Sequence, residues 1–278
     1  MIIAAGCRNR ENDKGVTLSV FCGAANKPAL QEIAARFERQ TGVKIEVVFG
    51  GSGSLLSQME LSCKGDIYLS GSPDYISVGY RKGLLIPNSD RTVAYLVPAI
   101  ITPAGKKADI RTLEDLARPG VRIGIGNPKT VCLGLYSVEL LERNGLLAPV
   151  MSNVVTFGGS CSKTANLAAM GMVDAVIGWS VFHDWNPAAM EVVPIAAEKI
   201  PRISYVAIAL PVFAKNRALS QRFIDYVMSD TGKKTYKRFG YITDRHRAQA
   251  IAPGATIGGE YHLPTAYYEL LNKAFQAK

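Results

Sequence analysis

Four short segments of this 278-residue sequence combine small residues with hydrogen-bond donors. They are Cys22–Lys27, Gly50–Ser54, Lys129–Gly134 and Gly158–Ser162. Free backbone N–H groups and the helix dipole at the start of a helix favour anions, and glycine lets the backbone approach a ligand closely. The hydroxyls of Ser52, Ser54, Ser160 and Ser162 add further donors. Each segment alone could be an ordinary helix cap, but together they predict an anion-binding site.

The elements that must position these segments alternate between strand and helix. Strands are predicted at Val16–Phe21, Val43–Phe49, Asp66–Ser70, Val121–Gly126, Val154–Phe157 and Asp174–Trp179. Helices are predicted at Pro28–Gln40, from Leu55, at Leu133–Asn144 and at Ser162–Met170. This alternation predicts an α/β fold with parallel sheets covered by helices.

Two uncharged extended segments, Thr92–Thr102 and Tyr205–Leu210, are long enough to run between two lobes. We therefore predict an N-terminal tether at 1–16, a first lobe at 17–95 plus 206–278, and an inserted second lobe at 96–205. Open parallel sheets bind ligands at the carboxyl ends of their strands, so the predicted site is a cleft between the lobes. The helical tail after Thr243 is expected to cover the first lobe.

Composition excludes several classes of function. The net charge is +9, but the basic residues are scattered, so nucleic-acid binding is not expected. The longest uncharged apolar window, Thr92–Gly105, is shorter than the roughly 18 residues that span a membrane.

Catalytic and metal-binding patterns are also absent from the sequence. The three histidines, His183, His246 and His262, are isolated, and no CxxC motif occurs, so neither a zinc site nor a cofactor is expected. The acid–base candidates near the predicted cleft are Asp66, Asp174 and Lys27, and we expect a structural or electrostatic role for each. The sequence thus favours a binding protein over an enzyme.

The N-terminal sequence Met1–Cys7 resembles the end of a bacterial lipoprotein signal peptide, followed by a polar tether. In this interpretation Cys7 carries the lipid, and the protein lies outside the cytoplasmic membrane, periplasmic or at the cell surface. Cys22, Cys63, Cys132 and Cys161 would then be in a compartment where disulfides can form. The alternative is an ordinary tail with a chance cysteine.

The chain resembles the molybdate-binding proteins of bacterial ABC importers, within the type II periplasmic binding proteins. The matching segments are Leu18–Ala25, Phe49–Leu55, Asp66–Ser70, Gly126–Pro128, Gly134–Tyr136, Asp174–Trp179 and Arg238–Ile242. Together they span residues 17 to 243, and it is their order and spacing that is typical of the family.

This resemblance implies two Rossmann-like α/β lobes that close on a tetrahedral oxyanion, most simply molybdate or tungstate. The donors carried over by position are Ala25 with its neighbour Asn26, Ser52, and the backbone at Leu133 and Cys161. Trp179 stands where the family usually has tyrosine, and Ala25 where it has serine. The implied partners are an ABC permease and, through a lipid on Cys7, the membrane; the protein itself is expected to be monomeric.

Cys132 and Cys161 map to the two ligand loops of the second lobe, so a disulfide between them is a hypothesis, with two separate thiols as the competing interpretation. A Cys22–Cys63 bond is less expected. The sequence also leaves open a binding protein for sulfate, a sensory binding module, an enzyme such as a transferase or deaminase on the same fold, and a soft-metal binder using Cys22, Cys132 and Cys161.

Overall fold

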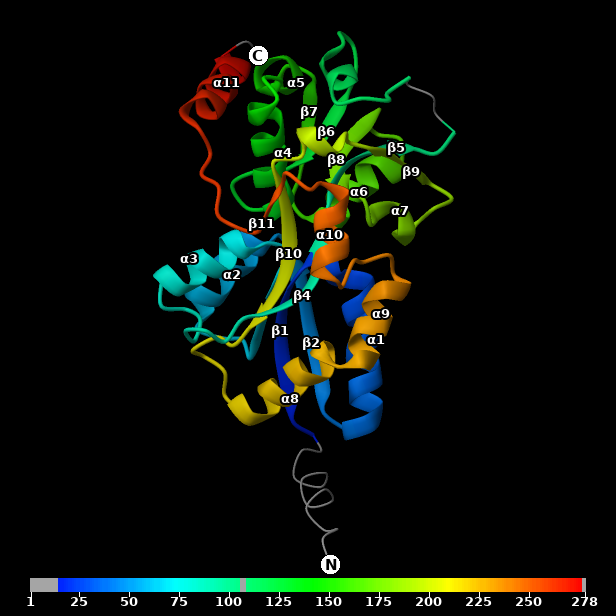
Figure 1. Ribbon diagram of the computed structural model, residues 1–278. Helices are drawn as coiled ribbons and strands as arrows, with labels where there is room; N and C mark the ends of the chain where they lie inside the picture. Colours follow the sequence, from blue (N-terminus) through cyan, green and yellow to red (C-terminus); the bar gives the residue numbers. More distant parts are fainter. Residues whose placement is uncertain (1–14, 106–108, 277–278) are drawn as a thin grey trace, which may run out of the picture.

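The computed structural model of this chain describes residues 15–105 and 109–276, and it consists of two α/β lobes stacked end to end (Figure 1). Each lobe contains one sheet, and helices lie on both sides of it. The predicted two-lobed α/β fold is therefore confirmed.

The sheet of the first lobe has the order β11-β10-β3-β1-β2, with β4 also paired to β10. Its strands are β1 (Thr17–Gly23), β2 (Lys44–Gly50), β3 (Ile67–Ser70), β4 (Arg91–Leu96), β10 (Arg202–Ala209) and β11 (Thr256–Ile257). The strands β1, β2 and β3 are parallel, as predicted, whereas β10 runs antiparallel to both β3 and β4. The carboxyl ends of β1, β2 and β3 therefore meet at the edge that faces the second lobe.

The described helices of the first lobe include two that the sequence predicted, at Pro28–Gln40 and from Leu55. The helices of this lobe are η1 (Ala24–Asn26), α1 (Lys27–Thr41), α2 (Ser52–Ser62), α3 (Pro73–Arg81), α8 (Arg217–Met228), α9 (Asp230–Arg238) and α10 (Arg245–Ile251). Helix α1 shows why these residues form a helix where they do. Pro28 lies in its first turn, Gly42 ends it at a φ of 75°, and Leu30, Ile33 and Phe37 are buried against the sheet.

The sheet of the second lobe has the order β7-β6-β8-β5-β9. Its elements are β5 (Pro98–Pro103), η2 (Glu114–Ala117), β6 (Ile123–Gly126), α4 (Cys132–Arg143), α5 (Leu147–Met151), β7 (Val154–Gly158), α6 (Cys161–Ala169), β8 (Ala175–Trp179), α7 (Phe182–Trp185), β9 (Met190–Pro194) and η3 (Ala197–Lys199). The strands β6, β7 and β8 are parallel, and β5 pairs antiparallel with β8 and β9.

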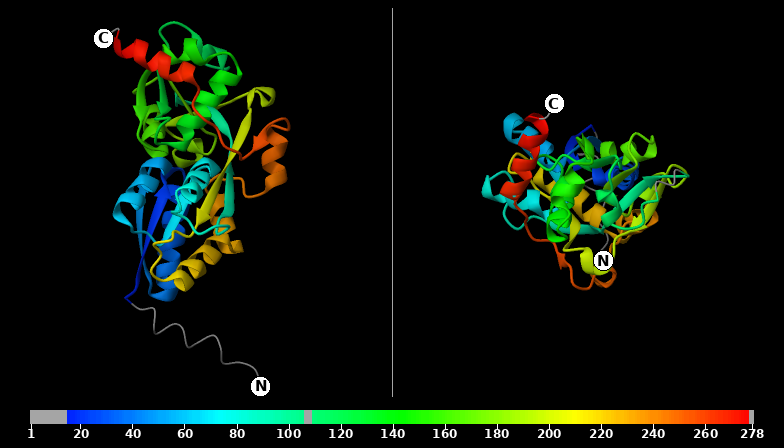
Figure 2. Two further views of the ribbon diagram at one scale, coloured as in Figure 1. Left: turned by 90° about the vertical axis from the view of Figure 1, so that its left-hand side faces the viewer. Right: turned by 90° about the horizontal axis from the view of Figure 1, so that it is seen from above.

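The chain passes between the lobes three times. Only Val97 separates β4 of the first sheet from β5 of the second, and β10 brings the chain back from the second lobe to the first. The third passage was not predicted. After β11 the chain returns to the second lobe, where α11 (Thr265–Gln276) packs against α5 (Figure 2). The expectation that the tail helix covers the first lobe is therefore wrong.

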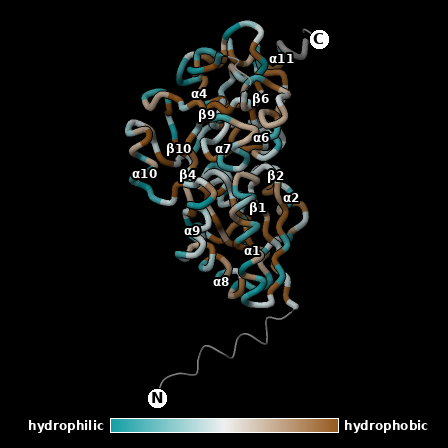
Figure 3. Tube along the Cα trace, turned by 90° about the vertical axis from the view of Figure 1, so that its right-hand side faces the viewer, coloured by the Kyte–Doolittle hydropathy of each residue, from teal (hydrophilic) through white to brown (hydrophobic). Residues whose placement is uncertain are grey.

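One continuous cluster of buried residues joins the two lobes. It contains Ala25 and Leu55 of the first lobe together with Leu133, Cys161 and Trp179 of the second. The lobes are thus closed on each other in this structure. Hydrophobic segments are distributed through both lobes (Figure 3), and no helix in the described part of the chain is long and apolar enough to cross a membrane.

Candidate anion-binding site

The four predicted segments all lie where the two lobes face each other. Each one leads into a helix: η1 begins at Ala24, α2 at Ser52, α4 at Cys132 and α6 at Cys161. The residues that the resemblance assigned to the ligand are fully or almost fully buried there: Ala25, Asn26, Ser52, Leu133, Cys161 and Trp179. Strand-to-helix junctions of two separate sheets therefore meet at one buried place.

Backbone hydrogen bonds connect the lobes at these junctions. The N–H groups of Gly53 and Ser54 both donate to the carbonyl oxygen of Thr130, at 3.0 and 3.4 Å. Ser162 Oγ donates to the carbonyl oxygen of Ala24 at 3.2 Å. These bonds are made only when the lobes are closed, because each has its donor and its acceptor in different lobes.

Gly71, which directly follows β3, lies between the side chains of the site. Its N–H donates to Ser52 Oγ at 3.1 Å. A Cβ placed on Gly71 would lie 2.8 Å from Cys132 Sγ and 3.4 Å from Ala25 Cβ. Glycine is therefore required here, and it allows Ala25, Ser52 and Cys132 to converge from both lobes. Sequence reasoning missed Gly71, although the Gly71–Ser72–Pro73 sequence after a strand is a helix-start signal of the same kind.

In the first turns of α2, α4 and α6, five backbone N–H groups have no acceptor within the described part of the chain. They belong to Ser52, Cys132, Leu133, Cys161 and Ser162. The first N–H groups of any helix lack an intrahelical partner, and burial without a partner is costly. An anion satisfies such donors and interacts favourably with the helix dipoles. Leu133 and Cys161, whose backbone the resemblance assigned to the ligand, are among these five, together with Cys132 and Ser162.

The thiols of Cys132 and Cys161 contact each other, and both are free in this structure. The neighbouring Cys161 thiol and burial raise the pKa of Cys132 well above its usual value, while the Ser52 hydroxyl acts in the opposite direction. Cys132 is therefore a neutral thiol at physiological pH. The two loops do converge, and the hypothesised disulfide is not formed in the closed lobes. Cys22 is buried and Cys63 is exposed, and both are free as well.

Trp179 ends β8 on the second-lobe side of the site. Its ring packs edge-on against Tyr136 of α4, with 5.1 Å between the ring centroids. Its Nε1 is buried and has no partner within the described residues. A buried indole N–H usually finds an acceptor, so Trp179 is a donor available for a ligand.

Asn26 and Tyr241 shape the first loop. The Asn26 amide donates to the carbonyl oxygen of Gly23 at 3.1 Å, so its side chain stabilises the turn between β1 and α1. Tyr241 OH donates to the carbonyl oxygen of Ala25, and burial raises the pKa of Tyr241 well above its usual value. Tyr241 lies in one of the segments that carry the resemblance, but no local pattern in the sequence indicates this contact.

The acid–base candidates from the sequence have structural roles. Asp66 accepts hydrogen bonds from the backbone N–H groups of Ser19 and Lys215, and Asp174 accepts one from that of Arg122. The Lys27 ammonium lies 5.8 Å from the centroid of the Phe49 ring. No group of three or more His, Cys, Asp or Glu residues within the described ranges could hold a metal ion.

Sequence comparison finds relatives of this chain among known binding proteins. The chain is 26% identical over 230 residues to a binding protein of Haemophilus influenzae, which covers 81% of this chain and 90% of the relative. It is 23% identical to the Bacillus subtilis ABC transporter substrate-binding lipoprotein YvgL, covering 87% and 94%. It is also 23% identical to the molybdate-binding protein ModA of Escherichia coli, covering 81% and 88%.

Solved structures share the fold. The periplasmic molybdate-binding protein of Azotobacter vinelandii matches with a TM-score of 0.70 and 19% identity, covering 82% of this chain and all of that one. The sulfate-binding protein SubI of Mycobacterium tuberculosis matches with a TM-score of 0.73 and 14% identity, covering 87% and 94%. The model of one family, described as bacterial extracellular solute-binding protein, matches residues 18–242. The chain therefore belongs to the bacterial extracellular solute-binding protein family.

Proposed function

We propose that this protein binds a tetrahedral oxyanion, molybdate or tungstate, between its two lobes and delivers it to an ABC permease. The observation that supports this most directly is the set of five unpaired N–H groups, within the described residues, at the starts of α2, α4 and α6, three helices whose first residues are buried. A dianion of four oxygens accepts from donors in both lobes at once, so it stabilises the closed conformation over the open one. The similarity to ModA of Escherichia coli points to molybdate.

Sulfate is the second candidate. The chain is 28% identical over 145 residues to the sulfate-binding protein of Synechococcus elongatus, a match that covers 46% of this chain. Charge and shape do not separate sulfate from molybdate, so selectivity would follow from the space that the two lobes leave when they close on the anion.

Tryptophan fluorescence tests the proposal, because the chain has two tryptophans and one of them lies at the site. Anion-free protein is titrated in turn with molybdate, tungstate, sulfate and phosphate. We expect a saturable change at micromolar or lower molybdate or tungstate and a far weaker response to sulfate. Trp179→Phe should remove the signal, and the matched control Trp185→Phe should keep it. Silence towards all four anions, repeated by calorimetry, would overturn the oxyanion proposal.

We further propose that the protein is a monomer anchored by a lipid on Cys7, which lies outside the described residues. The similarity to the lipoprotein YvgL supports the anchor. Expression behind a lipoprotein leader should place the protein in the membrane fraction, and Cys7→Ala should release it. Light scattering of the released form should give a mass near 30.0 kDa. A dimer mass, or membrane retention of Cys7→Ala, would reject the corresponding half of this proposal.

A further inference from the structure

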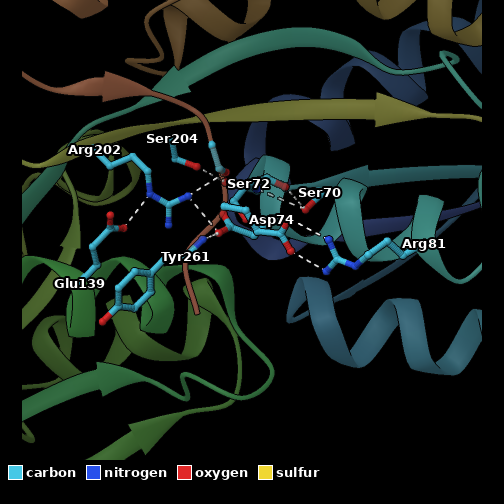
Figure 4. A network of polar contacts seen from close by, with 11 residues as sticks. Ser70, Ser72, Asp74, Arg81, Glu139, Arg202, Ser204 and Tyr261 are labelled. Atoms are coloured by element: carbon cyan, nitrogen blue, oxygen red, sulfur yellow. Dashed lines mark hydrogen bonds and ion pairs between the residues drawn. The ribbon is translucent and has the colours of Figure 1, made fainter. Parts of the chain in front are cut away.

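A buried ion network lies beside the anion site and bridges the two lobes (Figure 4). Arg202, at the start of β10, donates from Nη1 to Asp74 Oδ1 at 2.9 Å and from Nε to Glu139 Oε2 at 2.6 Å. Asp74 belongs to α3 of the first lobe and Glu139 to α4 of the second. Only 3% of Arg202 is exposed to solvent. We call Asp74, Glu139 and Arg202 the interlobe triad.

The C-terminal segment, which lies beyond the part matched by the family model, forms hydrogen bonds with this triad. Its Gly259 carbonyl accepts a hydrogen bond from Arg202 Nη1 at 2.9 Å. The N–H of Tyr261 donates to Asp74 Oδ1 at 3.0 Å, while its hydroxyl donates to Glu142 Oε2 of α4 at 2.7 Å. One residue of the tail therefore contacts both lobes.

Tyr136 links the triad to the anion site, and Ser204 links the strand that carries Arg202 to it. The Arg202 guanidinium lies 4.0 Å from the centroid of the Tyr136 ring, and Tyr136 packs against Trp179. On the other side, Ser204 Oγ, two residues along β10, donates to the carbonyl oxygen of Gly71 at 2.9 Å. Residues of β10 thus contact both Tyr136, which packs against Trp179, and Gly71, which lies between the side chains of the site.

Closure decides whether the triad can exist. Its two carboxylates belong to helices of different lobes, so separation of α3 from α4 takes at least one of them away from Arg202. Two surface pockets of about 370 and 380 Å³ flank the triad, one lined by Asp74 and the other by Glu139 and Arg202. Water therefore has a short path to these charges once the lobes part. In the closed lobes the three charges of the triad stabilise one another, because removing one partner of a buried ion pair leaves the remaining charges uncompensated.

We propose that Arg202 is the residue that permits closure, by neutralising two carboxylates that the closing lobes bury beside the anion site. This inference rests on the proposed function in that closure traps the ligand. Arg202 is a positioning residue: it contacts Tyr136, which packs against Trp179, and it donates nothing to the ligand itself.

The test compares Arg202→Met with the triple variant Asp74→Asn/Glu139→Gln/Arg202→Met. The single change leaves two unpaired carboxylates at the interface, so the open form should dominate in small-angle X-ray scattering, and molybdate should bind roughly 100-fold more weakly. The triple change removes all three charges, and it should restore closure and bring the affinity to within about tenfold of the original. The matched control is Arg238→Met, which breaks an ion pair with Glu32 inside the first lobe and should change neither readout.

The proposal would be overturned if Arg202→Met closed and bound molybdate as the original protein does. It would also be overturned if the triple variant closed and bound molybdate no better than Arg202→Met while both variants melted at the same temperature. If Arg202→Met does not fold, Asp74→Asn replaces it in the comparison with the original protein and the triple variant, because Asp74→Asn keeps Arg202 paired with Glu139. Small-angle scattering without ligand distinguishes a failure of the oxyanion function from a failure of the role proposed for Arg202. If no anion binds but Arg202→Met still shifts the population to the open form, the oxyanion function fails and the role of Arg202 stands.

Discussion

Gly51 of the first lobe lies so close to Thr130 of the second that a Cβ on Gly51 would be 2.6 Å from the Thr130 carbonyl oxygen. The other atoms nearest to that Cβ, on Val131 and Gly159, also belong to the second lobe. The closest contacts of a side chain at Gly51 are therefore all with the opposite lobe, so such a side chain obstructs closure.

Gly51→Ala should accordingly weaken anion binding by roughly 10- to 100-fold, the cost of inserting a methyl into a packed interface. Thermal melting without ligand should change little. Gly159→Ala is the matched control, because the nearest atom to its Cβ is a Lys163 side-chain carbon at 3.8 Å. Calorimetric titration of both variants checks this, and equal affinities would show that the closed interface tolerates the methyl.

Ser52 is expected to contribute its hydroxyl to the ligand. Hydrogen bonds to charged groups contribute about 1.5–3 kcal/mol, so Ser52→Ala should weaken binding by roughly 10- to 100-fold. Ser54, two residues further along α2, is exposed, and Ser54→Ala should bind as the original protein does. Fluorescence titration measures both. Similar losses in the two variants would point to a general effect on α2 rather than to a hydroxyl at the ligand.

Thiol reactivity should follow burial. Cys63 is exposed, whereas Cys22, Cys132 and Cys161 are buried, and burial raises the pKa of Cys22 well above its usual value. Since the thiolate is the reactive form, a thiol reagent at neutral pH should modify Cys63 quickly and the other three slowly. Bound anion should slow Cys132 and Cys161 further without changing Cys22. Mass mapping after timed alkylation checks this order, with Cys63→Ser as the control.

The same alkylation after denaturation without reductant tests the Cys132–Cys161 hypothesis. Protein from an oxidising compartment that yields both residues as free thiols carries no bond between them. A peptide pair linked through these two residues would show instead that the contact seen here can be oxidised.

Glu139 should make stability depend on pH. Burial raises its pKa above the usual value, although the Arg202 guanidinium opposes this shift. The native state therefore holds this proton to a higher pH than the unfolded state does. The resulting stabilisation is present below the unfolded pKa and is lost as pH rises through the native pKa.

Glu139→Gln cannot ionise, so its melting temperature relative to the original protein should rise between about pH 4 and pH 7, the range above an ordinary carboxyl pKa. Melting curves across this range measure the difference. A difference that moves the other way would mean that the pairing with Arg202 outweighs the cost of burial.

Local sequence signals were sufficient to predict the strand-to-helix junctions. Alternation of strands and amphipathic helices, with Pro28 and Gly42 at the ends of α1, depends on neighbouring residues alone. For the same reason the start of α6 was predicted to within one residue, at Ser162 instead of Cys161, and that of α2 to within three, at Leu55 instead of Ser52. That these junctions bind one tetrahedral oxyanion was implied by the family resemblance and not by their spacing in the sequence.

Contacts between distant segments could not be read in this way. Arg202 and Asp74 are separated by 128 positions, and no periodicity relates a residue at the start of β10 to one in the first turn of α3. Likewise, the apolar stripe of α11 required a partner surface, but either lobe could have supplied one; the structure places it on α5. Residue types and local periodicity thus determined the candidate binding segments and the strands and helices that hold them. The ion pairs and the course of the tail were decided by tertiary structure, because burial brings together charges and apolar surfaces that the chain keeps apart.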